Sequence, residues 1–387
     1  MSLTDLTLRA DLDRLLTSQE LDQNQVNLRD AIDKVAGRWY GETEPPVKVP
    51  GMEWIQQSIG VTLVRDPTNT TWLRKERAFV DMTGYSPVSS FKNKIINGDF
   101  LIWQRGASQI TSGYGSDDRW LNYHVGSTKT HSQQVHTPGQ AEVPGNPIYF
   151  SRTTVTSIAG DSNGVAKIQR IEDVRTFSGM VATLSFNARA DSPKKIGVVF
   201  YQNFGVGGSP AVVFGSHLVD VPTIWKRFAI TISVPSIMNM TIGVNNFISP
   251  VFVFDAGTSF LSGAGSVGRQ SGTFDLSEIQ FEAGAHATEF EQRPFTIEEA
   301  LCQRYFEAGV SGYESPNLIG QASSSKFRVI KRVIPTFVST NFYNIVNAKI
   351  GANRFITTGE FGRYCSAITD SAGQIAATEN WTADAEL

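Results

Sequence analysis

Residues 227–234 read RFAITISV, and this stretch decides the fold that we expect for most of the chain. Four apolar side chains alternate in it with small or polar ones: Phe228, Ile230, Ile232 and Val234 against Ala229, Thr231 and Ser233. A period of two places all four apolar side chains on one side of an extended strand. The pattern therefore predicts a strand with one face in a core and the other outside it.

Similar runs recur along the middle of the chain, separated by clusters of Gly, Pro, Asn and Ser. Short strands with turn residues between them are typical of two packed antiparallel sheets. We therefore predict one mainly β block over residues 93–293, built as a jelly-roll β-sandwich. The runs are VATLSFNARA at 181–190, KIGVVFYQNF at 195–204, AVVFGSHLVDV at 211–221, KRFAITISVP at 226–235 and TIGVNNFISPVFVFD at 241–255.

The chain of 387 residues is long enough for more than one domain, and its pattern changes several times. Before the sandwich we expect a helical segment and then a small β unit with a Pro-rich linker. After it, Thr296 and Glu299 form a capping box that predicts a short helix ending near Gly309. The predicted parts are 1–40 helical, 41–92 small β unit and linker, 93–293 sandwich, 294–309 connecting helix and 310–387 C-terminal β domain.

The leading helical segment carries a narrow apolar stripe. Leu21, Leu28 and Val35 recur every seven residues, and Ile32 lies between them. A stripe this narrow is typical of a short bundle or coiled coil formed with other copies of the chain. We therefore predict that these four residues mediate oligomerisation; a helix packed on its own chain is the alternative.

Composition and charge exclude several classes of protein. The net charge is −3, so the chain has no basic excess with which to bind nucleic acid. The cysteines, Cys302 and Cys365, are too few for a disulfide scaffold or a multi-Cys zinc site, and we expect buried free thiols. The acidic N-terminal residues do not resemble a signal peptide, and no apolar run reaches the roughly 20 residues of a membrane helix.

The motif GAGSVG at 263–268 matches a dinucleotide-binding fingerprint but lacks its context. That fingerprint works when a helix follows, because the helix N-terminus holds the pyrophosphate. Here RQSGTFDLSEIQF follows, without a helical stripe. We interpret 263–268 as a loop and predict no cofactor.

Catalytic and metal-binding patterns are missing from the sequence. The five histidines have no metal-site spacing, and no G-x-S-x-G elbow is present. Asp117 and Asp118 are adjacent, so in a strand their carboxylates would diverge. We predict a protein that is not an enzyme, with no metal and no catalytic residue, although carboxylates distant in sequence can meet in space.

Two stretches combine aromatic rings with amides and hydroxyls: GYGSDDRWLNYH at 113–124 and FYQNFGVGGSP at 200–210. Flat rings stack on the apolar faces of sugars, and amides and hydroxyls match sugar hydroxyls. Each residue could instead be an ordinary core or loop residue, and Trp120 is expected in the core. The candidate ligand-binding residues are Tyr114, Tyr123, Tyr201, Asn203 and Phe204.

The start of the sandwich, NKIINGDFLIWQRGAS at 93–108, predicts a strand, a tight turn at 97–99 and a second strand. Its apolar residues are expected in the core, with Phe281 from the end of the sandwich close by. These core residues are Ile95, Phe100, Ile102 and Trp103.

Three pieces in this order carry a family resemblance: NKIINGDFLIWQRG at 93–106, DDRWL at 117–121, and FDLSEIQFEAGAHATEFEQRPFTIEEALCQRYFE at 274–307. They resemble the jelly-roll module of bacteriophage tail-fibre and related virion proteins. Residues 51–74 resemble the small β unit placed near the N-terminus of such fibres. The same fold in carbohydrate-binding modules often holds a structural calcium, for which Asp99 and Asp275 are possible ligands by analogy; we do not include a metal in the prediction.

The resemblance implies a virion component, made in the host cytoplasm, that attaches a phage tail to the host surface. Its expected partners are two further copies of itself as a homotrimer, other tail or baseplate proteins at its N-terminus, and host polysaccharide or lipopolysaccharide. Nucleic acid and membrane insertion are not expected. The alternatives are a structural adapter that links virion proteins, and a depolymerase that cuts the polysaccharide.

Overall fold

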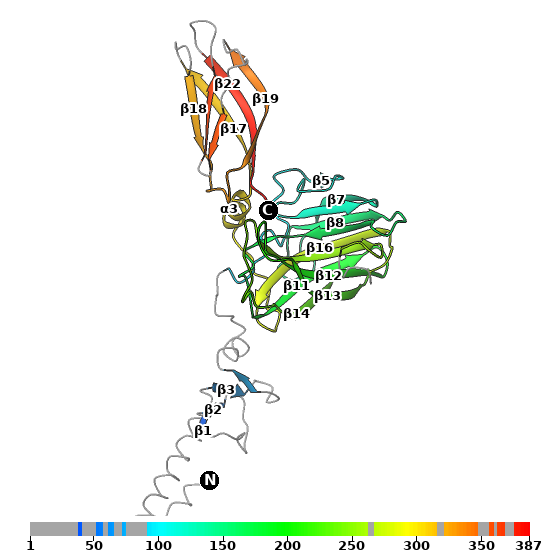
Figure 1. Cartoon of the computed structure of the whole chain (residues 1–387). Coiled ribbons are helices and arrows are strands. Elements are labelled where there is room, and N and C mark those ends of the chain that lie inside the picture. The colour runs from blue at the N-terminus through cyan, green and yellow to red at the C-terminus, as the bar shows by residue number, and fades with distance from the viewer. Residues whose placement is uncertain are drawn as a thin grey trace, which may run out of the picture. The chain divides into compact units, whose positions relative to one another are not determined.

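The computed structural model describes residues 38–40, 52–56, 61–65, 72–74, 91–261, 267–315, 321–346, 356–359, 362–367 and 375–387 (Figure 1). The chain divides into two compact units, Met1–Ser90 and Phe91–Leu387. The mainly β fold that the sequence predicts is confirmed. Among the described residues, no helix has the length and apolar character to cross a membrane.

The first unit contains a small sheet in the order β1-β2-β3-β4. This sheet agrees with the small β unit that the sequence predicts. It corrects the last residues of the predicted helical segment 1–40, because residues 38–40 form a strand that pairs in parallel with β2. The oligomerisation residues Leu21, Leu28, Ile32 and Val35 lie outside the described residues. The strands are β1 (Arg38–Tyr40), β2 (Glu53–Gln56), β3 (Val61–Arg65) and β4 (Trp72–Arg74).

The second unit begins with two stacked antiparallel sheets (Figure 1). We call one the arginine sheet, order β14-β11-β16-β8-β7-β5, and the other the tyrosine sheet, order β13-β12-β15-β9-β6, with β10 beside β15. Their strands are β5 (Ser108–Gln109), β6 (Leu121–Val125), β7 (Thr128–Val135), β8 (Tyr149–Thr156), β9 (Gly164–Ile168), β10 (Ile171–Glu172), β11 (Val181–Ala190), β12 (Lys194–Asn203), β13 (Val212–Val221), β14 (Lys226–Ser233), β15 (Phe247–Ala256) and β16 (Gly272–Ala283).

The five runs named in the sequence are β11 to β15, and the largest difference is that β15 begins at Phe247 rather than near residue 241. In β14 the alternation holds as predicted, since Ile230 and Ile232 are buried and Thr231 is exposed. Gly272–Ala283 after the GAGSVG motif is a strand, so no helix follows that motif.

Phenylalanines from both sheets fill the space between them. Phe186 of the arginine sheet meets Phe252 of the tyrosine sheet edge to face at 5.0 Å, and Phe254 meets Phe274 at 5.0 Å. Trp120 is completely buried beside Phe100, as predicted. Burying each such side chain stabilises the fold by about 1.5–3 kcal/mol, so this shared core holds the two sheets together.

The prediction of two strands at 93–108 is wrong except for Ser108, the first residue of the two-residue strand β5. Residues 93–107 form no strand, and Asn97 and Phe100 have positive φ of 57° and 56°. The Asn97 side chain makes hydrogen bonds to the backbone in place of those that a neighbouring strand would make. Its amide group donates to the Ile102 carbonyl at 2.8 Å, and its oxygen accepts the Ile102 N–H at 2.9 Å. Gly98 is required, because a Cβ there would lie 2.1 Å from the Ile279 carbonyl oxygen. Ile95, Phe100 and Ile102 are nevertheless buried, and Trp103 is partly buried.

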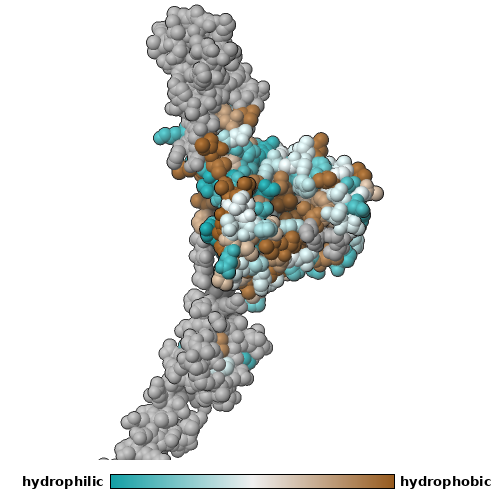
Figure 2. Space-filling view, in the orientation of Figure 1, coloured by the Kyte–Doolittle hydropathy of each residue, from teal (hydrophilic) through white to brown (hydrophobic). Residues whose placement is uncertain are grey.

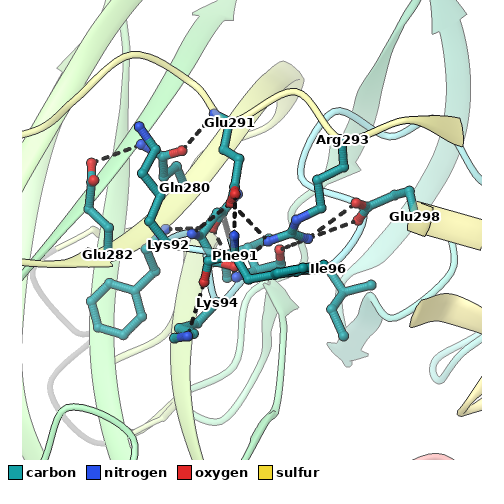
Figure 3. Close-up of polar contacts among 12 residues, drawn as sticks. Phe91, Lys92, Lys94, Ile96, Gln280, Glu282, Glu291, Arg293 and Glu298 are labelled. Carbon is teal, nitrogen blue, oxygen red and sulfur yellow. Dashed lines mark hydrogen bonds and ion pairs between the residues drawn. The ribbon is translucent and has the colours of Figure 1, made fainter. Parts of the chain in front are cut away.

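Hydrogen bonds and ion pairs centred on Arg293 join the start and the end of the sandwich (Figure 3). Its guanidinium donates to the Ile95 carbonyl at 3.1 Å and forms ion pairs with Glu298 at 3.2 Å and Glu291 at 3.3 Å. Glu291 also accepts the N–H of Asn93 at 2.9 Å. The residues that carry the family resemblance at this seam therefore have structural roles.

One helix, α3 (Phe295–Gln303), connects the sandwich to the C-terminal strands. Pro294 is its N-cap and no side chain caps it, so the predicted Thr296–Glu299 capping box is wrong. Gly309 is not a helix stop, because it lies inside β17. The strands that follow form sheets β17-β22-β19 and β18-β21-β20. They are β17 (Phe306–Ser315), β18 (Gln321–Lys326), β19 (Thr336–Val346), β20 (Ile356–Gly359), β21 (Gly362–Ala367) and β22 (Ile375–Asp384).

Candidate functional site

Exposed apolar residues alone do not mark a site on this molecule. Figure 2 shows apolar residues scattered among polar ones over the visible side of the sandwich. Single exposed apolar side chains are ordinary on soluble proteins. The informative features are the outer faces of the two sheets, where strands fix which side chains are neighbours.

The outer face of the tyrosine sheet carries a strip formed by Tyr123, Ile168 and Tyr201. All three are partly exposed and pack on a second apolar cluster, separate from the core between the sheets. Val199 belongs to that outer cluster while Val198 and Phe200 belong to the core, which assigns alternate residues of β12 to opposite faces. The strip is therefore a partly exposed apolar surface with an aromatic ring at each end.

Strand register places the strip diagonally across four strands. Tyr201 of β12 pairs with Ser249, and four residues further along β15 Val253 pairs with Ala166, which pairs with Tyr123. Strand spacings of about 4.8 Å and rises of about 3.3 Å per residue put the two rings roughly 20 Å apart. A surface of this length suits a short oligosaccharide rather than one small molecule.

The loop after β15 borders one side of the strip. Phe260 stacks on Tyr123 with ring centres 6.1 Å apart, and Leu261 packs on the same cluster. Asp255 anchors the base of this loop, since its carboxylate accepts from Ser157 Oγ at 2.7 Å and from the Gln270 N–H at 3.1 Å. The border is thus held by partly buried hydrogen bonds.

The other end of the tyrosine sheet carries Arg170, two residues after Ile168. Its guanidinium lies over the ring of Phe247, 4.9 Å from the ring centre, and donates to the Leu387 carbonyl. Tyr114 donates to the same carbonyl at 3.4 Å, and burial, with Glu386 nearby, raises the pKa of Tyr114 to about 12. Tyr114 therefore lies at the contact with the C-terminal residues.

The structure separates the five candidate ligand-binding residues. Tyr123 and Tyr201 share the strip, whereas Tyr114 is engaged at the C-terminal contact. Asn203 accepts the Gly205 N–H at 2.9 Å and so supports a turn. Phe204 is completely buried and offers no ring face to a ligand, which corrects that expectation.

Polar groups on the outer face of the arginine sheet bind one another. The guanidinium groups of Arg152 and Arg189 also lie over the ring of Phe150, which forms a small apolar cluster with Val143 and Trp225. Asp275 accepts from Arg152 Nε at 2.7 Å and from Arg189 Nε at 2.9 Å. Asn187 donates to Glu278 at 2.9 Å, and burial, with Asp99 nearby, raises the pKa of Glu278 to about 7. These contacts pair the five side chains with one another.

A cluster of ionisable residues, of the kinds found in catalytic sites, lies between the sheets. Lys167 forms an ion pair with Asp117 and donates to Asn122 Oδ1 at 2.8 Å, and His131 Nε2 lies 3.0 Å from Asp117 Oδ1. Burial lowers the pKa of His131 to about 4 and that of Lys167 to about 8. Burial alone would raise the pKa of Asp117, but His131 and Lys167 hold it below its usual range. Asp117, His131 and Lys167 have no exposed surface, so this cluster stabilises the core and is closed to substrate.

The adjacent carboxylates Asp117 and Asp118 do diverge. Asp118 accepts the Gln104 N–H at 3.0 Å, and burial raises its pKa to about 6. Asp99 and Asp275, the possible calcium ligands, have different surroundings. Asp275 forms ion pairs with two arginines. Burial, and then the nearby Glu298 carboxylate, raise the pKa of Asp99 to about 6. Within the described ranges, no group of three or more His, Cys, Asp or Glu is placed to hold a metal. Cys302 is a buried free thiol, as predicted.

Sequence reasoning missed Ile168 of the strip, and it missed the contact of Arg152 and Arg189 with one carboxylate. Arg152 and Arg189 are far apart in sequence, and only the pairing of β8 and β11 with β16 brings them to one carboxylate. The alternation in GVAKI at 164–168 could have placed Ile168 on the side of the sheet opposite Lys167, but not beside either tyrosine.

No family model matches the sequence, and no curated protein matches it. Among solved structures, a CBM4 module shares 17% identity, with a TM-score of 0.31, covering 49% of this chain and 98% of its own. The enzymatically active domain of tailspike protein 4 of bacteriophage CBA120 shares 13%, with a TM-score of 0.31, covering 50% of this chain and 22% of its own.

A family 11 carbohydrate-binding module from Clostridium thermocellum, solved with a β-1,3-1,4-mixed-linked tetrasaccharide, shares 12% identity. Its TM-score is 0.28, and the match covers 46% of this chain and 96% of the module. None of these likenesses assigns an activity to this chain.

Proposed function

We propose that the protein is a non-enzymatic component of a bacteriophage tail fibre that attaches the virion to the host as a homotrimer. It binds a cell-surface polysaccharide or lipopolysaccharide through the strip of Tyr123, Ile168 and Tyr201. The ordered motifs at 93–106, 117–121 and 274–307 support the virion assignment by resemblance.

The observation that carries the binding proposal is the strip itself. Sugar rings have apolar faces that stack on exposed aromatic rings, and two tyrosines on one rigid sheet face supply such rings at a fixed separation. A rigid sheet face also reduces the entropy that binding would otherwise cost. Weak stacking suits a trimer, because three linked sites bind one polysaccharide with higher avidity.

Binding without cleavage is favoured by the ion pairs of three buried aspartates. Asp117 is paired with Lys167, Asp255 with Arg269, and Asp275 with Arg152. Polysaccharide hydrolysis needs one carboxyl group that donates a proton and another that attacks or activates water. Carboxylates held in these ion pairs are poorly placed for either role.

The test measures binding of the labelled full chain to an array of bacterial polysaccharides and lipopolysaccharides. We expect the Tyr123→Ala/Tyr201→Ala variant to bind at least about five-fold more weakly than the wild type, because two stacking contacts of about 0.5–1.5 kcal/mol each are lost. Tyr149→Ala is the matched control, since Tyr149 is a partly exposed tyrosine on β8 of the other sheet.

Each outcome has a definite consequence. Equal binding by the wild type and the strip variant would overturn the strip as the site. Failure of the wild type to bind any glycan would favour the adapter, and release of shorter chains would favour the depolymerase. Sedimentation of the same samples as a monomer at micromolar concentration would overturn the homotrimer.

A further inference from the structure

A pocket of about 550 Å³ opens at the end of the sandwich where β11 turns into β12. Pro193, Val221 and Pro222 supply its apolar lining, and Lys194 and Lys195 supply cationic groups. The volume lies in the range of ordinary small-ligand sites, which combine apolar walls with a few fixed polar groups. This pocket is separate from the strip.

Hydrogen bonds hold the polar lining in place. The Gln270 amide donates to the carbonyls of Lys195 and Phe254, the latter at 2.7 Å. The Lys194 ammonium donates to the Ser271 carbonyl at 2.7 Å. The pocket is thus formed before any ligand arrives, which reduces the cost of binding.

The charges around the pocket balance. Lys195 lies 3.5 Å from Asp220, and Lys194 lies 3.4 Å from Asp191. A balanced rim gives an anionic ligand no net attraction. The Asp220 side chain is 90% exposed and that of Lys195 is 50% exposed, so their loose pair contributes little to stability and its groups remain accessible.

We propose that this pocket is a second glycan site that binds a neutral sugar residue. Adjacent sugar hydroxyls both donate and accept, so one diol can accept from the Lys195 ammonium and donate to the Asp220 carboxylate. The apolar face of the sugar then rests on Pro193 and Pro222. The inference rests on the proposed function, because it assumes that the sandwich binds glycans.

The pocket and the strip lie on either side of Val267, which packs on the outer face of the tyrosine sheet. Lys195 and Tyr201 are both on β12, and six residues of extended strand put them roughly 20 Å apart. Gly197 lies between them, and a Cβ there would lie 2.4 Å from the Val267 side chain. A long polysaccharide can therefore occupy both sites of one chain, and a short one only one of them.

The test compares four full-chain proteins on an array of neutral and acidic oligosaccharides and polysaccharides. They are the wild type, the pocket variant Lys195→Ala/Asp220→Ala, the strip variant Tyr123→Ala/Tyr201→Ala, and the control Arg175→Ala. The pocket variant keeps the net charge and changes only exposed side chains, so its thermal unfolding midpoint should equal that of the wild type. Arg175 is an exposed cation remote in sequence from the pocket, with a side chain 62% exposed.

We expect the pocket variant to lose about ten-fold in affinity for neutral glycans that the strip variant still binds. The pocket variant should not lose more affinity for acidic glycans than for neutral ones. If the pocket variant keeps all wild-type binding while the strip variant loses it, the inference fails and the proposed function stands. If the pocket variant loses only acidic glycans, the neutral assignment is overturned; if the wild type binds no glycan, both proposals fail.

Discussion

The two sheets of the sandwich share one core but have opposite outer faces. On the arginine sheet, Arg152, Arg189 and Asp275 bind one another, and Asn187 binds Glu278. On the tyrosine sheet, the strip of Tyr123, Ile168 and Tyr201 packs against the outer apolar cluster and remains partly exposed. The first face is largely satisfied by internal contacts, whereas the second keeps aromatic surface available.

This difference separates stability from recognition within one fold. A polar group that already has good partners gains little by exchanging them for a ligand, because the net free energy of such an exchange is small. An exposed ring still gains when a sugar covers it. Polar residues on a sheet face are therefore weaker indicators of a binding site here than a few half-exposed tyrosines.

The largest expected effect comes from the ion pair that lies between the two sheets. Asp117→Ala leaves the ammonium of Lys167 completely buried without a counter-charge. Removing one partner of a buried pair costs about 3–5 kcal/mol of the free energy of unfolding. Urea unfolding of the second unit at pH 7, followed by tryptophan fluorescence, measures this loss.

Two further variants test whether the loss arises from the unpaired charge. Adding Lys167→Met to Asp117→Ala should recover part of the stability, because an apolar side chain replaces the buried charge. Asp220→Ala, at an exposed position, should change the free energy of unfolding by less than about 0.5 kcal/mol. A loss below about 1 kcal/mol for Asp117→Ala would show that the pair does not hold the sheets together.

A smaller and pH-dependent effect is expected at Glu278 on the arginine sheet. Burial raises the pKa of Glu278 to about 7 from its usual 4.5. The folded state therefore binds this proton more tightly, and the stability that it contributes below pH 4.5 is lost as the pH rises to about 7. Glu278→Gln removes that loss, so the variant should gain stability relative to the wild type over this range, on the order of 1 kcal/mol.

The difference between variant and wild type is the quantity to measure, because other groups titrate in the same range. Asp99 and Asp118, with pKa values raised to about 6 chiefly by burial, change stability in the same direction. His131 and His136, with pKa values lowered to about 4 chiefly by burial, oppose it, since their contribution is lost as the pH falls from 6.5. Unfolding at pH 5 to 8 with Glu142→Gln as an exposed control isolates Glu278. A difference that stays flat with pH would contradict the assignment.

The strands were largely predictable from sequence, and the leading segment was not. In β14, Ile230 and Ile232 alternate with polar residues, so local pattern and tertiary burial agree. In residues 93–107 the apolar residues also reach the core, but the backbone is irregular. The side chains of Asn93 and Asn97 hold this backbone by hydrogen bonds to Ile95, Ile102 and the distant Phe281. A repeating pattern of apolar residues does not predict such contacts.

The candidate site was predictable only in part for a related reason. Tyr123 and Tyr201 stood out as aromatic residues in polar stretches, but their shared face depends on the pairing of β12, β15, β9 and β6. Phe204 has the same local surroundings as Tyr201 and is nevertheless buried. Composition identifies the kind of residue that binds a sugar, whereas strand register decides which of them are exposed together.

The smallest expected effect tests whether the arginine sheet takes any part in recognition. Arg152→Lys keeps the charge but loses the two-point contact with Asp275, in which Nε and Nη2 donate at 2.7 and 2.8 Å. Because the Arg152 side chain is 33% exposed and Arg189 still pairs with Asp275, the free energy of unfolding should fall by no more than about 1 kcal/mol. Glycan affinity should be unchanged in the array, since no strip residue contacts this pair. A several-fold loss of affinity with unchanged stability would contradict the division between the two faces, because it would place the guanidinium of Arg152 against the ligand.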